Sequence, residues 1–190
     1  RGWDRPIWLE TTRHDPGRQM TAVAVRKQVD LVLGAGGDGT IRVICDELAG
    51  TGIPFGIIPA GTGNLLCRNL GIPLDEPSAL RVAFDGVPTP TDLVQIFVDD
   101  EEEGEACAVM AGIGIDAAIM ERTDAELKKV VGSAAYFLAA AQNANHPPLP
   151  VTITVDGGEP FRRRASVLLV GNVGILQGGI QILPGARTDD

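Results

Sequence analysis

The sequence has few cysteines, histidines and aromatic residues, and it has no long hydrophobic run. Its 190 residues include three cysteines and two histidines, and aromatic residues make up 4%. Because Cys45, Cys67 and Cys107 lie far apart among apolar residues, they lack metal-ligand spacing and are interpreted as reduced core thiols of a cytoplasmic protein. The best apolar run, AAYFLAAA at 134–141, is shorter than the roughly 20 residues that a membrane-spanning helix needs.

Positive charge is also scarce in this chain. The formal net charge is −9, and the isoelectric point is about 4.7. This sign opposes the electrostatic attraction on which nucleic-acid binding depends, so we expect no nucleic-acid partner. Six of the seven residues from Asp99 to Glu105 are acidic. A solvated turn between two strands explains this run more simply than a cation site does.

Hydrophobic residues make up 44% of the sequence, which is enough for a buried core. In the first half, the short apolar runs VDLVLGA (29–35) and PFGIIPA (54–60) predict two buried strands. Each run is followed by a glycine-rich turn and then by a helical pattern, the first ending near Gly50 and the second near Gly71. This alternation predicts an α/β layer with parallel strands.

The second half follows a different pattern. Residues 86–92, GVPTPTD, indicate a linker, so we expect domains at 1–88 and 89–190. Four strand-like runs predict an antiparallel sheet or sandwich: DLVQIFV (92–98) and EACAVMAGI (105–113) flank the acidic turn, and VTITV (151–155) and ASVLLVGN (165–172) flank the turn DGGEP. One or two helices are expected between 116 and 144.

The two glycine-rich turns are the strongest candidates for a functional site. Glycines in GGDGT (36–40) and GTGN (61–64) let backbone N–H groups approach a phosphate at the start of a helix. Asp38 would repel that phosphate unless a cation lies between them, which points to Mg²⁺ or to a proton-accepting role. Thr40 suits either a phosphate contact or a helix cap. Thr62 and Asn64 add neutral donors, whereas the Walker A and dinucleotide-binding patterns are absent.

GGDGT and the later stretch PAGTGNLLCRNLGIP (59–73) resemble the catalytic domain of the diacylglycerol kinase and sphingosine kinase superfamily, in its bacterial form. The resemblance continues in ETTRHDPG (10–17), AGIGIDAAI (111–119), GSAAYFLAA (132–140) and GNVGILQGGIQILPGARTDD (171–190), so it covers nearly the whole chain. It implies an NAD kinase-like α/β domain that binds MgATP, followed by a mostly antiparallel, β-sandwich-like domain that helps to admit a lipid.

The same resemblance assigns roles to individual residues. The residues expected to contact ATP are Thr12 (with Thr11 as the alternative), Gly36, Gly37, Asp38, Gly39, Thr40, Ile41, Arg42, Gly61, Thr62, Gly63 and Asn64. Asp38 would join a network of Mg²⁺ and water, and Asp190 would lie near a structural Mg²⁺. The family's first strand would precede Arg1 and its general base would follow Asp190, so we expect these 190 residues alone to have little or no kinase activity.

The implied function is an ATP-dependent lipid kinase of phospholipid biosynthesis that transfers the γ-phosphoryl group to a lipid hydroxyl, with diacylglycerol as the expected acceptor. The expected cofactors are ATP and Mg²⁺, and the expected location is the cytoplasm with transient membrane association. A homodimer is a candidate assembly. Two alternatives stay open, an NAD kinase-like enzyme and an inactive nucleotide-binding regulatory module. The stretch VVGSAAYFLAA (130–140) suits either a lipid cleft or an ordinary core helix.

Overall fold

The computed structural model describes residues 2–97, 104–114, 148–176, 179 and 181–189. The chain forms two compact units. The first contains residues 1–109 together with 187–190, and the second contains residues 110–186. The functional division that the sequence suggests after residue 88 stays a prediction.

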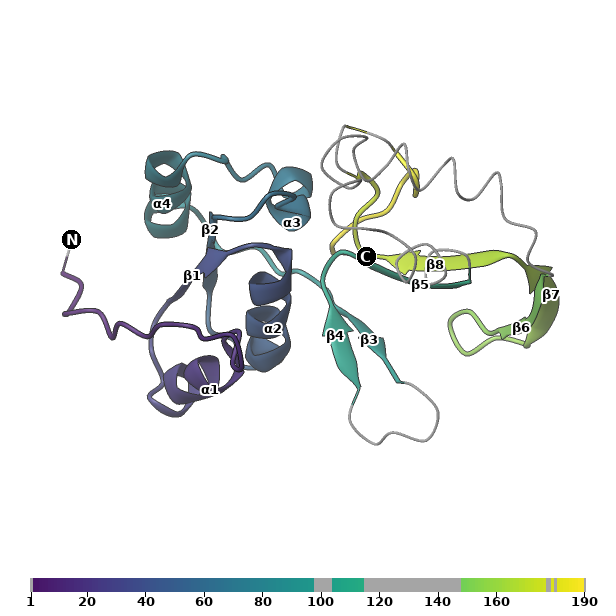
Figure 1. Cartoon of the computed structure of the whole chain (residues 1–190), viewed down its shortest axis with the longest axis horizontal. Helices are drawn as coiled ribbons and strands as arrows, with labels where there is room; N and C mark the ends of the chain where they lie inside the picture. Colours follow the sequence, from purple (N-terminus) through teal and green to yellow (C-terminus); the bar gives the residue numbers. More distant parts are fainter. Residues whose placement is uncertain (1, 98–103, 115–147, 177–178, 180, 190) are drawn as a thin grey trace. The chain divides into compact units, whose positions relative to one another are not determined.

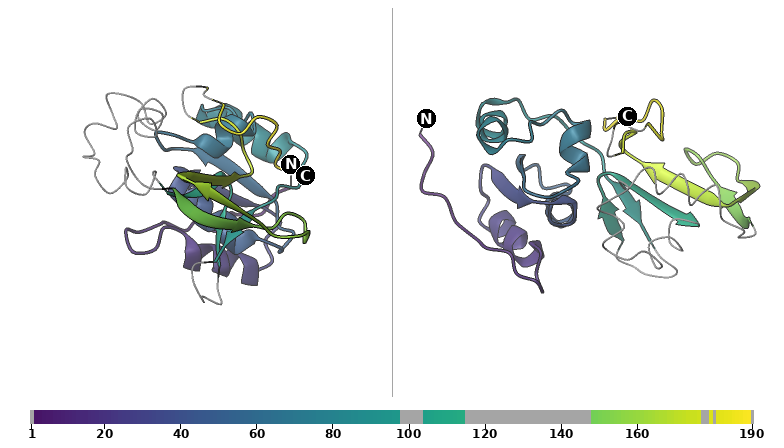
Figure 2. Two further views of the ribbon diagram at one scale, coloured as in Figure 1. Left: turned by 90° about the vertical axis from the view of Figure 1, so that its right-hand side faces the viewer. Right: turned by 45° about the horizontal axis from the view of Figure 1, so that its top comes forward.

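A pair of parallel strands forms the centre of the first unit. Strand β1 (Val32–Gly36) pairs with β2 (Phe55–Pro59), with Gly34 opposite Ile57. Helix α2 (Asp38–Leu48) packs on β1, and α1 (Arg18–Arg26) packs on α2. Helix α4 (Glu76–Asp85) packs on β2, on the opposite side of the strands (Figure 1; Figure 2, right). The parallel α/β layer predicted from the two apolar runs is therefore confirmed.

The core of this unit is built from the apolar side of α2 and from the strand β2. Ile41, Ile44 and Leu48 are buried at helical spacing, and Ile57 and Ile58 are buried on β2. Beyond the end of α2, Gly50 has a φ of +70°, a conformation that glycine adopts without strain. The predicted end of this helix is therefore confirmed.

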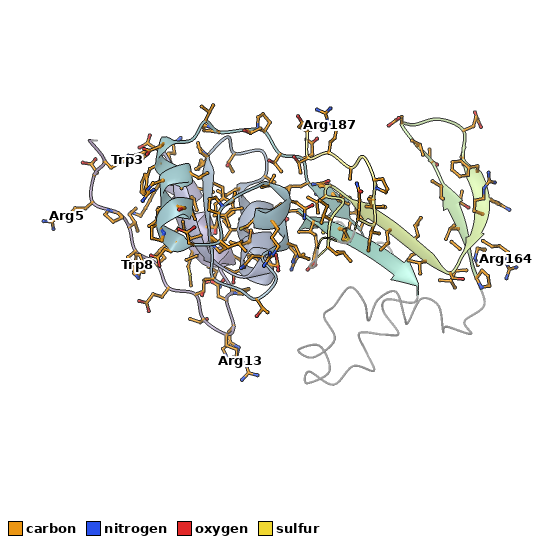
Figure 3. The ribbon with its side chains drawn as sticks, turned by 90° about the horizontal axis from the view of Figure 1, so that it is seen from above. Trp3, Arg5, Trp8, Arg13, Arg164 and Arg187 are labelled. Carbon is orange, nitrogen blue, oxygen red and sulfur yellow. The ribbon has the colours of Figure 1, made fainter. Side chains whose placement is uncertain are left out.

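Shorter elements complete the first unit. Helix α3 (Leu65–Asn69) follows β2 directly. The carboxylate of Asp75 caps α4 by accepting a hydrogen bond of 3.1 Å from the backbone N–H of Ser78, and hydrogen bonding from Ser78 lowers the pKa of Asp75. Near the start of the chain, the ring of Trp3 (labelled in Figure 3) contacts the ring of Phe84 of α4 edge-on, with the two ring centres 5.7 Å apart.

The predicted hairpin around the acidic run is present as strands β3 (Val94–Ile96) and β4 (Glu105–Cys107), which pair antiparallel. The predicted run 105–113 is not one strand. It divides at Ala108 and Val109, and its second part is β5 (Met110–Gly114), in the other unit. Asp92, just before β3, donates its backbone N–H to the carbonyl oxygen of Thr188 at 2.7 Å.

The second unit contains two antiparallel strand pairs. Strand β5 pairs with β8 (Val167–Gly171), and β6 (Leu149–Ile153) pairs with β7 (Phe161–Ala165). The prediction that 151–155 and 165–172 flank one turn was therefore wrong, because an additional strand, β7, lies between them. Strand β7 was not predicted, because its three consecutive arginines do not form the apolar pattern by which strands were identified. Asp156 and Glu159 do lie in the turn between β6 and β7, as predicted.

The helices expected between 116 and 144, including 130–140, lie outside the described residues, and so does Asp190. No helix in the described part of the chain has the length and apolar character needed to cross a lipid bilayer. The described part of the chain thus has parallel strands covered by helices, followed by strands that pair antiparallel, as the sequence predicts.

Candidate phosphate-binding site

The two glycine-rich turns lie against each other at the ends of β1 and β2. The backbone N–H of Ala60 donates to the carbonyl oxygen of Gly36 at 2.9 Å, which extends the pairing of the strands into the turns. A Cβ atom built on Gly37 would lie 3.1 Å from the Cα of Gly61, and one built on Gly61 would collide with Gly37. The absence of side chains is thus what lets these two backbones meet.

Asp38 connects the first turn to the helix that follows the second. It is the first residue of α2, and its Oδ1 accepts a hydrogen bond of 2.6 Å from the backbone N–H of Leu65, the first residue of α3. A Cβ built on Gly63 would lie 2.7 Å from Asp38 Oδ2. Asp38 therefore caps α3 from another element, a structural role that needs no bound cation.

Asn64 closes the second turn on itself. It adopts a left-handed backbone conformation with a φ of 48°, and it is 8% exposed. Its Oδ1 accepts from the N–H of Gly61 at 2.9 Å, and its Nδ2 donates to the carbonyl oxygen of Gly61 at 2.8 Å. Both ends of its side-chain amide thus hold the turn, and the expected contact to a nucleotide stays a prediction.

Arg68 was not among the residues predicted from the sequence. Its Nε donates to the carbonyl oxygen of Gly63 at 2.8 Å, although its side chain is exposed. The spacing could have revealed it, because a residue four positions after Asn64 lies one helical turn beyond the loop. Arg68 brings a positive charge to the second glycine turn.

The N-terminus of α2 offers backbone donors at the first turn. Gly37 is the N-cap and has no side chain to satisfy the free N–H groups, and Gly39 is exposed. The alternative that Thr40 caps this helix is wrong, because Thr40 is the third residue of α2 and packs against Gly36. N–H groups at a helix N-terminus that have no partner within the helix can donate hydrogen bonds to an anion such as a phosphate.

Ile41 and Arg42, which follow the first glycine turn, both have contacts within the protein. Ile41 is a core residue, and its N–H donates to Gly37 within the helix at 3.0 Å. The guanidinium of Arg42 pairs with Glu105 of β4 at 3.1 Å and lies 3.5 Å from the carbonyl oxygen of Ala106. These contacts already explain both residues structurally, and their roles toward ATP stay predictions.

The Thr-containing turn lies just before α1. Thr12 Oγ1 accepts from the N–H of Asp15 at 3.1 Å, and Asp15 Oδ1 accepts from the N–H of Gly17 at 2.9 Å. Thr11 and Thr12 are both exposed, and a Cβ built on Gly17 would lie 3.9 Å from the Thr11 methyl carbon. Thr62, in the second glycine turn, is exposed as well.

The local charge of the site is set by Asp38 together with Arg68. Burial raises the pKa of the Cys67 thiol, and the negative charge of Asp38 raises it further. Within the described residues, no three His, Cys, Asp or Glu side chains cluster in a way that could hold a metal ion. Asp38 is a carboxylate that could hold a Mg²⁺ ion at the glycine turns, with phosphate and water oxygens as the other ligands.

Two protein families match the chain in succession. The family described as "Diacylglycerol kinase catalytic domain" matches residues 6–96, and so includes both glycine turns. The family described as "YegS C-terminal NAD kinase beta sandwich-like domain" matches residues 108–190.

Individual relatives agree with these matches. A protein of Mycobacterium tuberculosis (strain CDC 1551 / Oshkosh) named "Diacylglycerol kinase" is 35% identical over 93% of this chain and 57% of its own length. A Stenotrophomonas maltophilia (strain K279a) protein named "Probable lipid kinase YegS-like" is 30% identical over 89% of this chain and 56% of its own length. A crystal structure of a diacylglycerol kinase from Bacillus anthracis str. Sterne has a TM-score of 0.72 and 28% identity, and the match covers 95% of this chain and 57% of that one. The chain spans less than two thirds of the length of these relatives.

Proposed function

We propose, from the premise that this chain belongs to the family of diacylglycerol kinases and YegS-like lipid kinases, that its two glycine turns bind the phosphates of ATP. The reaction would transfer the γ-phosphoryl group to the hydroxyl of a lipid, with diacylglycerol as the acceptor we expect. The proposed enzyme works at a membrane surface from the cytoplasmic side.

The observation that carries this proposal is the meeting of the two turns around Asp38. Backbone N–H groups at the start of α2 and the close approach of Gly37 to Gly61 form a surface that phosphate oxygens can reach without steric hindrance from side chains. Phosphoryl transfer requires mainly that the phosphate is held in position and its charge is offset. A rigid backbone cradle supports the first of these requirements.

Asp38 and Arg68 would supply the charges of this cradle. When bound to ATP, Mg²⁺ would neutralise part of the phosphate charge. Asp38 Oδ1 is engaged with Leu65, and Asp38 Oδ2 faces Gly63, so this carboxylate would keep the second turn in place and present charge at the cradle. Arg68, fixed through Gly63, would keep a cation beside the same turn.

The remaining parts of the mechanism also stay proposals. Asp190 would lie near a structural Mg²⁺, and the base that accepts the hydroxyl proton would follow Asp190 in the complete protein. Thr12 and Thr62 are exposed and would contact the nucleotide. A homodimer stays a candidate assembly.

The variant Asp38→Asn tests the role of the charge. The Oδ1 of asparagine can still accept the hydrogen bond from Leu65, so the cap of α3 is retained and the melting temperature should change little. We expect the transfer of labelled phosphate from ATP to diacylglycerol by the complete protein to fall on the order of a hundredfold or more. Sphingosine and NAD serve as competing acceptors in the same assay.

The exposed residue Asp30 provides the matched control, because Asp30→Asn removes the same charge just before β1, at the opposite end of this strand from the first glycine turn. That variant should keep the wild-type rate. Transfer by Asp38→Asn at the wild-type rate would contradict the proposed role of this charge. Transfer by the wild-type protein to NAD and not to diacylglycerol would show that the acceptor is a nucleotide and not a lipid.

A further inference from the structure

The hairpin of β6 and β7 carries an unusual concentration of positive charge. Arg162, Arg163 and Arg164 form the only run of three basic residues in a chain of net charge −9. All three residues are exposed. None of the elements that form the glycine turns includes them, so the proposed phosphate site does not explain their presence.

The register of the hairpin places two of these arginines on one face. Arg162 lies opposite Thr152, and Arg164 lies opposite Pro150, and all four residues are exposed. Because successive side chains of a strand point to opposite faces, Arg162 and Arg164 share this face and Arg163 points to the other. We call the face formed by Pro150, Thr152, Arg162 and Arg164 the basic face of the hairpin.

The arginines of the hairpin have no carboxylate partner in the part of the chain that the structure describes. Among the residues that the structure describes, none of the three forms an ion pair. Arg164 donates to the carbonyl oxygen of Pro148 at 3.1 Å, and Arg163 donates to that of Arg162 at 3.0 Å and lies 5.1 Å from the ring centre of Phe161. Figure 3 shows Arg164 at the outer side of the hairpin. Each contact leaves further N–H donors for an external anion.

Exposed apolar side chains lie on the other face of the hairpin, because Leu149 and Phe161 alternate along the strands with the residues of the basic face. Leu149 is 47% exposed, Phe161 39%, and Val155, just beyond the end of β6, 58%. The hairpin is therefore amphipathic, with arginines on the basic face and apolar side chains on the other, a pattern that suits the boundary between lipid headgroups and acyl chains. A nucleic acid would match the phosphate-binding donors but not these apolar groups, and the acidic chain would repel it.

We propose that the basic face of the β6–β7 hairpin binds the headgroup phosphates of anionic phospholipids and so holds the protein at a membrane surface. Arginine matches a phosphate with paired N–H donors, and an anionic membrane attracts a basic cluster within about 10 Å of its surface. Asp156 and Glu159 lie in the hairpin turn, so the strand face makes the contact and the tip does not. This proposal rests on the proposed function in one respect, which is that the substrate lies in a membrane.

The double variant R162Q/R164Q tests this surface by co-sedimentation with vesicles of phosphatidylglycerol and phosphatidylcholine. We expect the partition coefficient of the protein on these vesicles to fall on the order of tenfold, and we expect weak binding of wild-type protein to pure phosphatidylcholine. The control R26Q/R81Q removes the same charge from exposed positions on α1 and α4 and should bind like wild type. Melting temperatures of all variants check that each one is folded.

Several results would overturn the docking proposal. These are equal vesicle binding by R162Q/R164Q and wild type, no vesicle binding by wild type, and binding to single-stranded RNA in preference to vesicles at equal phosphate concentration. The kinase proposal is tested separately with the complete protein, by the ratio of phosphoryl transfer to vesicle-borne and to dissolved short-chain diacylglycerol. A complete absence of transfer with normal vesicle binding would contradict only the kinase proposal, whereas a variant that lowers this ratio supports both.

Discussion

Two glycines of the candidate site differ in what surrounds them. A Cβ on Gly61 would collide with the backbone of Gly37, whereas a Cβ on Gly39 would have no heavy atom within 4 Å. Gly39 lies inside α2, where alanine is a better helix former. The fold therefore requires a glycine at position 61, in the second turn, whereas it does not explain the glycine at position 39, in the first turn. Gly39 is the stronger indication of a ligand.

This difference predicts opposite effects on stability. Gly61→Ala should lower the free energy of unfolding by about 1–3 kcal/mol, because the methyl group must displace backbone. Gly39→Ala should leave it unchanged or raise it by up to about 1 kcal/mol, yet weaken the binding of ATP because the methyl group faces the approaching phosphate. Thermal unfolding and titration with ATP measure the two effects. Unchanged ATP affinity in Gly39→Ala would contradict a contact between the phosphates and this part of α2.

At the scale of elements, α2 connects the cradle to the rest of the first unit. Its Asp46 accepts from Arg18 of α1 at 2.6 Å and from the backbone N–H of Ala106 in β4 at 3.2 Å. Arg18 also pairs with Glu47 at 2.6 Å. The side chain of Asp46 is 15% exposed, so its two bonds are partly shielded from water. Burial raises the pKa of the neighbouring Cys45 thiol to about 11, and the negative charge of Asp46 makes a smaller contribution to this rise.

Asp46→Ala and Glu47→Ala form a matched pair on adjacent residues. Asp46→Ala should lower the free energy of unfolding by about 1–3 kcal/mol, because it leaves the N–H of Ala106 without its carboxylate partner. Glu47→Ala removes only one branch of an exposed ion pair and should cost about 0–1 kcal/mol. Denaturant unfolding of the two variants provides the comparison. Equal destabilisation would show that Asp46 does not join α2 to β4 in solution.

At the scale of the whole molecule, the chain contains the proposed cradle but spans only 57% of the length of the Mycobacterium tuberculosis relative. We predict that residues 1–190 bind ATP, because the two glycine turns and α2 lie within the first unit. We also predict that they transfer phosphate to diacylglycerol at least about a hundredfold more slowly than the complete protein, because the general base is expected beyond Asp190. Transfer by the two proteins at equal concentration checks this, and comparable rates would contradict it.

The sequence by itself determined the type and order of the elements around the cradle. Short apolar runs followed by glycines predicted β1 and β2 as parallel strands, and their pairing confirms this. The predicted burial is confirmed for β2 but was wrong for β1, in which Leu33 and Ala35 are exposed. The same reasoning missed β7, because Arg162, Arg163 and Arg164 follow no apolar alternation. It also joined β4 to β5, since no breaking residue separates them and only their different pairing partners divide them.

Only the tertiary structure decided which atoms of the motif meet. The sequence indicated Asp38 as a cation or proton partner, but the bond from Leu65 joins residues 27 positions apart and depends on the packing of two turns. Arg68 and Asp46 likewise act through backbone groups that no side-chain pattern reveals. Local spacing is encoded in the order of residues, whereas contacts between distant backbone groups arise only when the strands pair, and this is why the motif was predictable and its internal bonding was not.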